Sequence, residues 1–356
     1  MFSFVVPLLG QEANTVFDLL ADEDVVEVTL RTDLVKLLQS VHAAGDYQPA
    51  TISFRSQERG LERWDLKVRV RGKFRRISCD FPPILLNFSK SELIKRNLLP
   101  HDKLKLVTHC LDDQARGEEH LLREYLAYRL YNEISPYSYR VQLVRMRYVD
   151  DSRTLSDVVA YGFIIEDTDE LGDRIQAKEC DDCKGVASAA YEAEPTMMHA
   201  MFQYLIGNAD YSLPVLRNVK AFRRDIDQQL IPVGYDFDFS GFVEAPYALP
   251  ANHLGQLTIR QRIYLGIERS DAELLRVMAH FDAKRKNLLR IVNDFKPLPR
   301  SVREELKEYI LIFYDQMDAI RAAGAKNIYR QLRQEHPEAI PDGGSPVDYG
   351  LSERRR

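Results

Sequence analysis

Ile206-Gly207-Asn208-Ala209-Asp210 is the first of three motifs on which the expected architecture of this chain rests; the other two are Arg217-Asn218-Val219-Lys220 and Tyr235-Asp236-Phe237-Asp238-Phe239. Asp210 follows an apolar helical segment, and Asn218 comes eight residues later, where a strand is expected to begin. A hairpin from Asn218 to Asp236 would bring both residues back towards Asp210. In an extended segment, Asp236 and Asp238 would share one face and the aromatic residues the other.

These residue types, in this order, suit a metal-assisted transfer of a phosphoryl group. Such a site needs a carboxylate that orients a hydroxyl and oxygen ligands for the Mg²⁺ that screens the phosphates. The transfer itself depends on positioning and on neutralising charge more than on covalent chemistry. Taken one at a time, the same residues are also common in turns and helix caps.

Composition sets broad limits on the class of protein. The chain has 356 residues, of which 45% are hydrophobic and 29% are charged, as in ordinary globular proteins. That length suits two structural units or one two-lobed domain. A net charge of −5 gives no reason to expect nucleic acid as a partner. No apolar run reaches the length that crosses a membrane, so no transmembrane segment is expected.

The two ends of the chain are expected to differ from the rest. Residues 1–24 begin with an apolar stretch that lacks a basic region before it, so it is either the remnant of a secretion signal or else a first strand or a frayed terminus. The first alternative implies an exported or cell-envelope protein, and the second a cytoplasmic one. Residues 335–356 are rich in Pro, Gly and Arg, and we expect them to be disordered.

The four cysteines do not make a disulfide scaffold of the kind found in small secreted proteins. Cys180 and Cys183 form one CxxC motif between acidic residues, which favours a chance or redox-sensitive pair over a zinc site. Cys79 and Cys110 end two expected neighbouring strands. They would form a disulfide in an exported protein and remain buried thiols otherwise.

The periodicity of the sequence divides the chain near residue 166. Residues 25–166 read mainly as strands with one convincing helix, Glu118–Tyr131; residues 66–71 alternate strictly between apolar and basic side chains. Residues 167–334 are irregular up to residue 194 and mostly helical from Pro195, with a helix that stops at Gly207. Further helices are expected at Leu257–Gly266, Ser270–Phe281, Ala283–Phe295 and Ser301–Arg333.

Several motifs, in order, resemble the CotH-type (spore coat protein H-like) atypical protein kinases. Residues 70–75 with residues 81–88 look like their Arg-Gly strand and the strand after it, and residues 122–127 resemble their Leu-Arg…Leu-Ala helix. Residues 210–218 are similar to their catalytic loop, an Asp with an Asn eight residues on. Residues 232–238 look like their Pro-Trp-Asp-x-Asp metal motif, with Tyr235 in place of Trp. Residues 73–76, Lys-Phe-Arg-Arg, depart from the small polar residues usual in the family.

The resemblance implies an α+β, two-lobed protein-kinase-like fold, with a β-rich N-lobe containing one main helix and a mostly helical C-lobe. The N-lobe would be residues 25–166 and the C-lobe residues 167–334, with ATP between them. Asp210 would be the catalytic residue. Asn218 and Asp236 would hold Mg²⁺, or alternatively Mn²⁺, and Asp238 would be an alternative or second ligand.

A kinase-like site also needs a cation on the ATP phosphates, usually a strand Lys paired with a helix Glu. Lys105 with Glu124 is the predicted pair, and Lys103 on the same strand face is its alternative. Arg71 lies in the matched Arg-Gly strand, and Glu166 would lie at the hinge, where backbone groups meet adenine. Solvated sheet edges and turn chemistry explain these residues as well.

Three functions follow from these patterns. The first is an ATP- and Mg²⁺-dependent kinase that acts on a hydroxyl, of a protein by expectation. The second is a catalytically inactive, kinase-fold binding or assembly protein of the cell envelope. The third is a metal-dependent hydrolase using Asp210, Asp236 and Asp238, which leaves Lys105 and Glu124 without a role.

Overall fold

The computed structural model describes residues 14–40, 46–322 and 332, and these fall into two compact units. The first unit contains the described residues up to 132, residues 138–176 and residues 295–300. The second contains residues 133–137, 177–294 and the described residues from 301 onward. The expectations for the tail at residues 335–356 and for residues 1–13 of the N-terminal segment lie outside the described residues.

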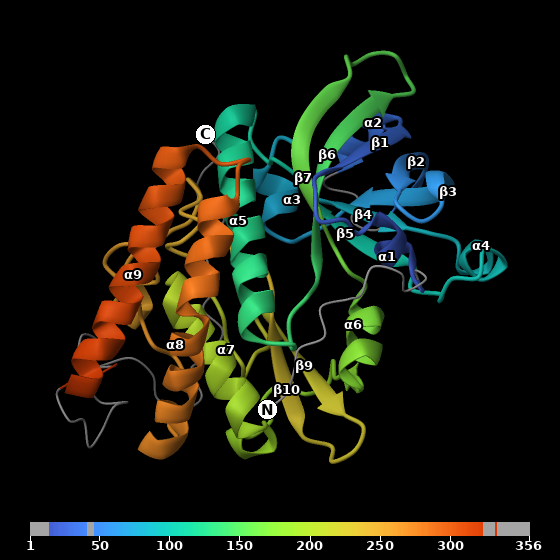
Figure 1. The fold of residues 1–356 in the computed structure, drawn as a ribbon. Helices are drawn as coiled ribbons and strands as arrows, with labels where there is room; N and C mark the ends of the chain where they lie inside the picture. The colour runs from blue at the N-terminus through green and yellow to red at the C-terminus, as the bar shows by residue number, and fades with distance from the viewer. Residues whose placement is uncertain (1–13, 41–45, 323–331, 333–356) are drawn as a thin grey trace. The chain divides into compact units, whose positions relative to one another are not determined.

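The first unit is built on a closed β-barrel (Figure 1). In the order in which neighbours pair, its strands are β1 (Val26–Thr32), β2 (Gln48–Ser56), β3 (Gly60–Val70), β4 (Ile84–Asn87), β5 (Lys103–Val107), β7 (Val158–Ile165) and β6 (Val141–Asp150). β1 and β6 run parallel and close the barrel, with Val28 opposite Met146. Every other neighbouring pair is antiparallel.

The closed barrel shows that the expected two-lobed protein-kinase-like fold, with a β-rich N-lobe and a mostly helical C-lobe, is wrong. An N-lobe of that kind has an open sheet, whereas here β1 and β6 join the two ends of the sheet. The physical reason is that alternation along a strand reveals which face is buried but not which strand lies beside it. A pairing between strands far apart in sequence therefore leaves no local signal.

The strands themselves follow their hydrophobic pattern. In β3, Trp64, Leu66, Val68 and Val70 are buried, and the charged residues between them are more exposed. Side chains alternate across a strand, so this pattern places one face in the barrel core and the other towards solvent. The strict alternation expected for residues 66–71 is confirmed as far as Val70, where the strand ends.

Helices of the first unit cap and flank the barrel. They are α1 (Val16–Leu20), α2 (Leu34–Gln39), α3 (Arg75–Ser78), α4 (Lys90–Lys95), α5 (Gln114–Ile134) and α6 (Thr168–Ile175). α5 contains the predicted helix Glu118–Tyr131, and its last two residues belong to the second unit. α6 was expected to be irregular. Asp167 starts it by accepting a hydrogen bond from the Asp169 backbone amide, as a helix N-cap does.

The second unit has a three-stranded antiparallel sheet in the order β10 (Leu230–Gly234), β9 (Val219–Arg224) and β8 (Ala177–Glu179). Its helices are η2 (Ser188–Ala190), α7 (Ala193–Ile206), η3 (Asn252–Leu254), α8 (Asp271–Asp294) and α9 (Arg300–Ala322). α7 packs against β10 and α8. It ends at Gly207, as predicted, in the left-handed conformation with φ of 65°.

Two helix predictions in this unit need correction. The segments Ser270–Phe281 and Ala283–Phe295 form one continuous helix, α8, because Asp282 between them does not interrupt it. Leu257–Gly266 is not helical. There the Gln261 side chain accepts a hydrogen bond from the Leu257 backbone, and Gln256 donates to the Gln261 carbonyl, so side chains replace the helical pairing.

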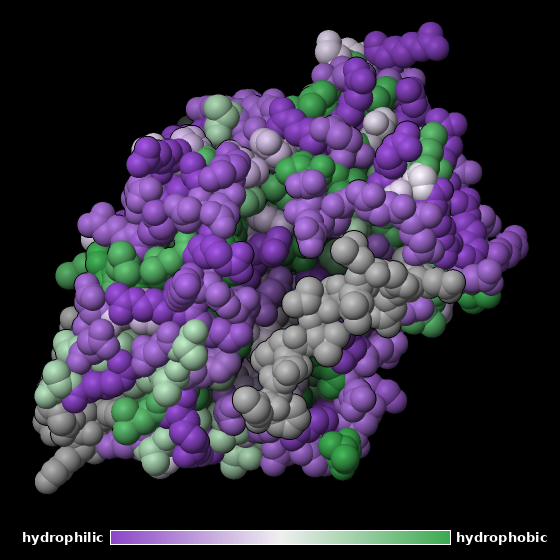
Figure 2. All heavy atoms as spheres, in the orientation of Figure 1, coloured by the Kyte–Doolittle hydropathy of each residue, from purple (hydrophilic) through white to green (hydrophobic). Residues whose placement is uncertain are grey.

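Within the described ranges, no helix combines the length and apolar character needed to cross a membrane. On the face shown in Figure 2, hydrophilic residues predominate and hydrophobic residues form small separate groups. Scattered exposed apolar side chains of this kind are normal on protein surfaces and do not mark a binding face.

Candidate functional site

The loop after α7 positions Asp210 in the second unit. Gly207 turns the chain with a positive φ, and a Cβ atom at this position would collide with the Tyr309 hydroxyl of α9. Asn208 then fixes the loop, because its side chain donates to Gln203 Oε1 at 2.9 Å and accepts from the Asp210 backbone amide at 2.9 Å. The Asp210 carboxylate is therefore held on a short turn that these hydrogen bonds stabilise.

Asn218 and Arg217, which directly precede β9, hold the Asp210 side chain through a hydrogen bond and an ion pair. The Asn218 side-chain nitrogen donates to Asp210 Oδ2 at 2.9 Å and to the Asp210 carbonyl at 2.7 Å. Arg217 Nε lies 3.2 Å from Asp210 Oδ1. Asn218 has a φ of 51°, a conformation that Asn tolerates better than most residues. These bonds use the nitrogen of the Asn218 amide and not its oxygen, the atom that ligates a metal.

Asp236 and Asp238 follow β10 and approach the same place. Each offers a carboxylate oxygen within 4.8 Å of the other. The Tyr235 backbone amide donates to the Asn218 carbonyl at 3.1 Å, which holds the end of β10 beside the start of β9. Phe237 is fully buried, with its ring 5.6 Å from that of Phe202, so an aromatic anchor fixes the chain between the two acids.

The expected extended geometry of this acidic segment is not observed. Asp236 has a left-handed φ of 62°, and β10 ends before it at Gly234. The two carboxylates are close because the chain turns at Asp236, not because they alternate along a strand. A Cβ atom on Gly234 would lie 2.7 Å from His199 Cε1 and 2.8 Å from Gln203 Nε2, so only Gly allows β10 to reach this turn.

Electrostatics couple the three acids of the second unit. Burial is the main cause that raises the pKa of Asp210 to about 6; repulsion from Asp238 and Asp236 adds to it, while Arg217 and the Asn218 hydrogen bond oppose it. A divalent cation placed among these groups would relieve the repulsion. The carboxylates of Asp236 and Asp238, with the amide oxygen of Asn218, form a hard, all-oxygen donor set of the kind that Mg²⁺ prefers, so the residues fit that ion.

His199 of α7 supports the loop without acting as an acid or a base. It is 1% exposed, and burial lowers its pKa to about 3, so the ring stays neutral. Its ring lies edge-on to Tyr211, with the ring centres 5.1 Å apart. We infer a packing role for it.

The residues expected to hold ATP all lie in the first unit. Lys105 Nζ donates to Thr168 Oγ1 at 2.7 Å and lies 4.7 Å from the centre of the Tyr139 ring. The Lys103 side chain is half exposed, and its Nζ lies 4.0 Å from Asp102 Oδ1. These contacts account for both lysines inside the unit, and a role on ATP phosphates stays a prediction.

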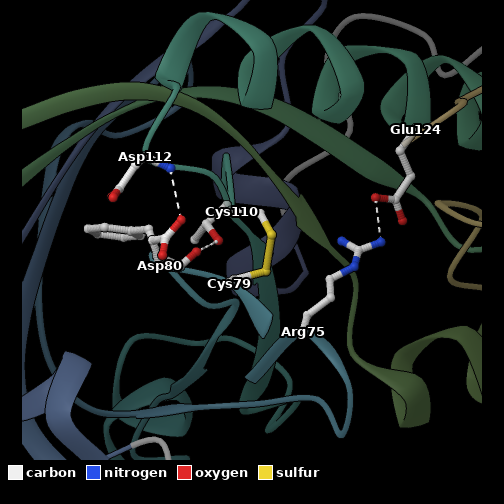
Figure 3. The surroundings of a disulfide bond; sticks show 8 residues. Arg75, Cys79, Asp80, Cys110, Asp112 and Glu124 are labelled. Carbon is white, nitrogen blue, oxygen red and sulfur yellow. Dashed lines mark hydrogen bonds and ion pairs between the residues drawn. A yellow bond between two sulfur atoms is a disulfide. The ribbon is translucent and has the colours of Figure 1, made fainter. Parts of the chain in front are cut away.

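Glu124 forms an ion pair that the sequence did not reveal. Its carboxylate lies 2.7 Å from the guanidinium of Arg75, and both side chains are buried (Figure 3). In the sequence, Arg75 lies in the basic run of residues 73–76, which gives no sign of burial. The signal that could have identified it is its position in a short segment rich in apolar residues between two strands, where a long side chain can turn inward.

Arg71 and Glu166 also make structural contacts. The Arg71 backbone amide donates to the Pro83 carbonyl at 2.8 Å, which continues the pairing of β3 with β4. Glu166 is fully buried, and its carboxylate lies 2.8 Å from Arg140 Nε and 2.6 Å from Arg174 Nη2. Its side chain therefore secures the end of β7.

Both pairs of cysteines form disulfides. Cys79 and Cys110 join the segments flanking β4 and β5, and Figure 3 shows this bond beside the Asp80–Asp112 hydrogen bond. Cys180 and Cys183 close the CxxC motif in the second unit. Of the two alternatives open for Cys79 and Cys110, the structure has the disulfide.

Comparison with known proteins adds no relative. A scan against protein-family models found no match, and a search of curated proteins found none. The functional assignment therefore rests on the geometry of the residues themselves.

Proposed function

We propose that the second unit carries a Mg²⁺-dependent phosphotransfer site that moves the γ-phosphoryl group of ATP to a hydroxyl, of a protein as the expected acceptor. One observation carries the proposal: Asn218 and Arg217 fix Asp210 in place, and Asp236 and Asp238 present carboxylate oxygens within 4.8 Å of each other. Such a site supplies positioning and charge neutralisation, which this reaction requires.

Asp210 is assigned the role of accepting the proton of the attacking hydroxyl. A general base works best when its pKa lies near the working pH, and burial brings that of Asp210 to about 6. Arg217 and Asn218 orient the carboxylate so that one oxygen faces a fixed direction. As the hydroxyl oxygen bonds to the γ-phosphorus, the bond to the bridging oxygen of ATP breaks and ADP leaves.

Asp236, Asp238 and the side-chain oxygen of Asn218 are the residues that would hold Mg²⁺. The ion, when bound, neutralises charge on the phosphate oxygens. The described residues that line this place come from two loops and the start of β9, each fixed by backbone pairing. That rigidity favours a defined coordination geometry, which Mg²⁺ demands.

A non-catalytic binding protein is the second candidate. The observation that favours it is that two of the residues expected to contact ATP form ion pairs: Glu124 with Arg75, and Glu166 with two arginines. A protein of this kind would keep the acidic site for metal or ligand binding and would transfer no phosphate.

One experiment separates these candidates. The purified full chain is incubated with ATP and Mg²⁺, and phosphate on protein and ADP release are measured for the native chain and for Asp210→Asn. We expect Asp210→Asn to lower the rate at least about 100-fold, the lower end of the effect of a general base, and to keep nucleotide affinity. Asp225→Asn, in the exposed β9–β10 turn, is the matched control and should leave the rate unchanged.

Thermal unfolding with and without ATP and Mg²⁺ completes the test. A ligand that binds the native state at 100 times its Kd adds about 2.7 kcal/mol of stability. Native transfer rates in Asp210→Asn would reject the catalytic role. Stabilisation by the ligands without any transfer would establish the binding protein instead.

A further inference from the structure

The CxxC motif of the second unit is surrounded by groups that stabilise its reduced form. Cys180 and Cys183 follow β8, and their sulfurs form a disulfide across three residues of sequence. Arg223 of β9 points its guanidinium at both sulfurs: Nη2 lies 3.3 Å from Cys180 Sγ and 3.1 Å from Cys183 Sγ. A positive group shared by the two sulfurs is not required to hold a neutral disulfide.

The positive charge of Arg223 has an effect once the Cys180–Cys183 disulfide is reduced. A thiolate beside Arg is stabilised, which lowers the pKa of the thiol and improves it as a leaving group. Asp182 Oδ1 lies 3.0 Å from Cys180 Sγ. The sulfur of a disulfide has no hydrogen to donate, so this contact becomes an S–H···O hydrogen bond only after reduction. Both polar contacts therefore favour the dithiol over the disulfide.

Access differs between the two sulfurs. Cys180 is 7% exposed and Cys183 is 1% exposed. Asp181, Asp182 and Lys184 beside them are exposed, so the motif lies at the surface of its unit. An incoming thiolate would meet Cys180 first, and Cys183 would leave towards Arg223.

We propose that Cys180 and Cys183 form a thiol–disulfide exchange site that accepts two electrons from a dithiol reductant. A thiolate of the reductant attacks Cys180 Sγ, the Cys180–Cys183 bond breaks, and Cys183 leaves as a thiolate held by Arg223. The second thiol of the reductant then displaces Cys180, which takes up the proton of that thiol and keeps it in an S–H···O hydrogen bond to Asp182. The reductant leaves as a disulfide after supplying two electrons, and the proton of its first thiol passes to solvent because Cys183 remains a thiolate beside Arg223.

Reduction of the Cys180–Cys183 disulfide should also affect the loop that carries Arg217. The Gly185 backbone amide donates to the Pro214 carbonyl at 2.7 Å. Leu213 and Leu216 pack against the buried cluster that contains both cysteines. Opening the disulfide frees residues 180–183 and weakens this support, so backbone exchange in residues 212–218 should become faster.

A metal site is the competing explanation of the same residues. Cys180, Asp182 and Cys183 present ligand atoms within 4.8 Å of one another. A structural zinc site needs four ligands, and the Arg223 guanidinium directed at both sulfurs would repel a cation. We therefore assign the motif to electron exchange.

The test is a redox titration of the full chain with dithiothreitol, in which alkylation and mass spectrometry report each disulfide separately. Cys79–Cys110 is the internal reference. We expect Cys180–Cys183 to be reduced with an equilibrium constant at least 100-fold more favourable, which is about 59 mV for a two-electron couple. Hydrogen exchange of residues 212–218 is followed in the same samples and should accelerate on reduction.

Variants of Arg223 identify the cause. Arg223→Gln should make reduction about tenfold less favourable, and Arg223→Lys, which keeps the charge, should restore part of the difference. Arg224→Gln is the matched control, because Arg224 pairs with Glu192 and Asp227 and not with the sulfurs. Equal potentials for the two disulfides, equal effects of Arg223→Gln and Arg224→Gln, or stoichiometric Zn²⁺ that blocks alkylation of the reduced motif would each overturn the proposal.

Discussion

The environment of the Asp210 carboxyl group disfavours its ionised form. It is largely buried, and Asp236 and Asp238 lie close enough to raise its pKa further. The positive charge of Arg217 offsets only part of the effect of burial and repulsion, since the pKa of Asp210 remains raised to about 6. A carboxylate kept under such conditions is typical of functional sites, where binding of a cation or a substrate relieves the repulsion.

This environment predicts a pH-dependent affinity for Mg²⁺. The pKa of Asp210 is raised from 3.8 to about 6, so the native state binds this proton more tightly than the unfolded state does. Stability from this group is thus greatest below pH 4 and falls as the pH rises to 6. Mg²⁺ competes with the proton, and its affinity should be about tenfold lower at pH 5 than at pH 7.

Isothermal titration with Mg²⁺ at the two pH values measures this effect. In Asp210→Asn no proton competes at this position, so the affinity should lose that part of its pH dependence. An unchanged pH profile in the variant would show that the charge of Asp210 does not affect binding of the ion. The exposed-turn variant Asp225→Asn should keep the native profile.

Single residues show where sequence reasoning succeeds and where it stops. The convergence of Asp210 and Asn218 was predictable, because a helix, a loop and a hairpin fix their separation within one unit. The buried Arg75–Glu124 pair was not, since burial of a charged side chain depends on a partner far away in sequence. A run of basic residues looks the same in the sequence whether its side chains face solvent or the interior.

At the scale of elements, the end of α7 shows how backbone conformation and packing can together require one residue type. Gly207 combines a φ of 65° with close approach to the Tyr309 hydroxyl. Helices commonly end with Gly in this conformation, so the sequence alone placed the boundary. The irregular run at residues 257–266 had an apolar pattern that also fits a helix, and side-chain hydrogen bonds from Gln256 and Gln261 decided against it.

Gly207→Ala should destabilise the second unit by about 2–4 kcal/mol. Roughly 1 kcal/mol comes from the left-handed backbone, and the rest from the collision with Tyr309 on α9. Gly60→Ala isolates the first contribution, because Gly60 has a φ of 74° but nothing within 4 Å of an added Cβ. Urea unfolding of both variants measures the difference. Equal losses would show that α9 moves aside without cost.

At the scale of the whole molecule, closure of the barrel could not be predicted from the sequence. β1, β2 and β3 alternate between buried and more exposed residues, yet the parallel pairing of β1 with β6 places side by side two segments that are far apart in the chain. Among the described residues, the buried cluster around the barrel of the first unit draws members from Val16 to Ile164. Local patterns determine strands and helices, whereas long-range pairing determines which fold they build.

The Cys79–Cys110 bond should act on the first unit alone. It closes a separation of 31 residues around β4 and β5, and a crosslink of that length stabilises a protein by about 3.7 kcal/mol, mainly by restricting the unfolded chain. Cys79→Ser with Cys110→Ser should therefore lower protection from hydrogen exchange in β3 to β5. Exchange in β9 and β10, which pair with each other and with β8, should stay unchanged. Cys180→Ser with Cys183→Ser is the converse control, and equal loss of protection in both units from either double variant would mean that the two cores unfold as one.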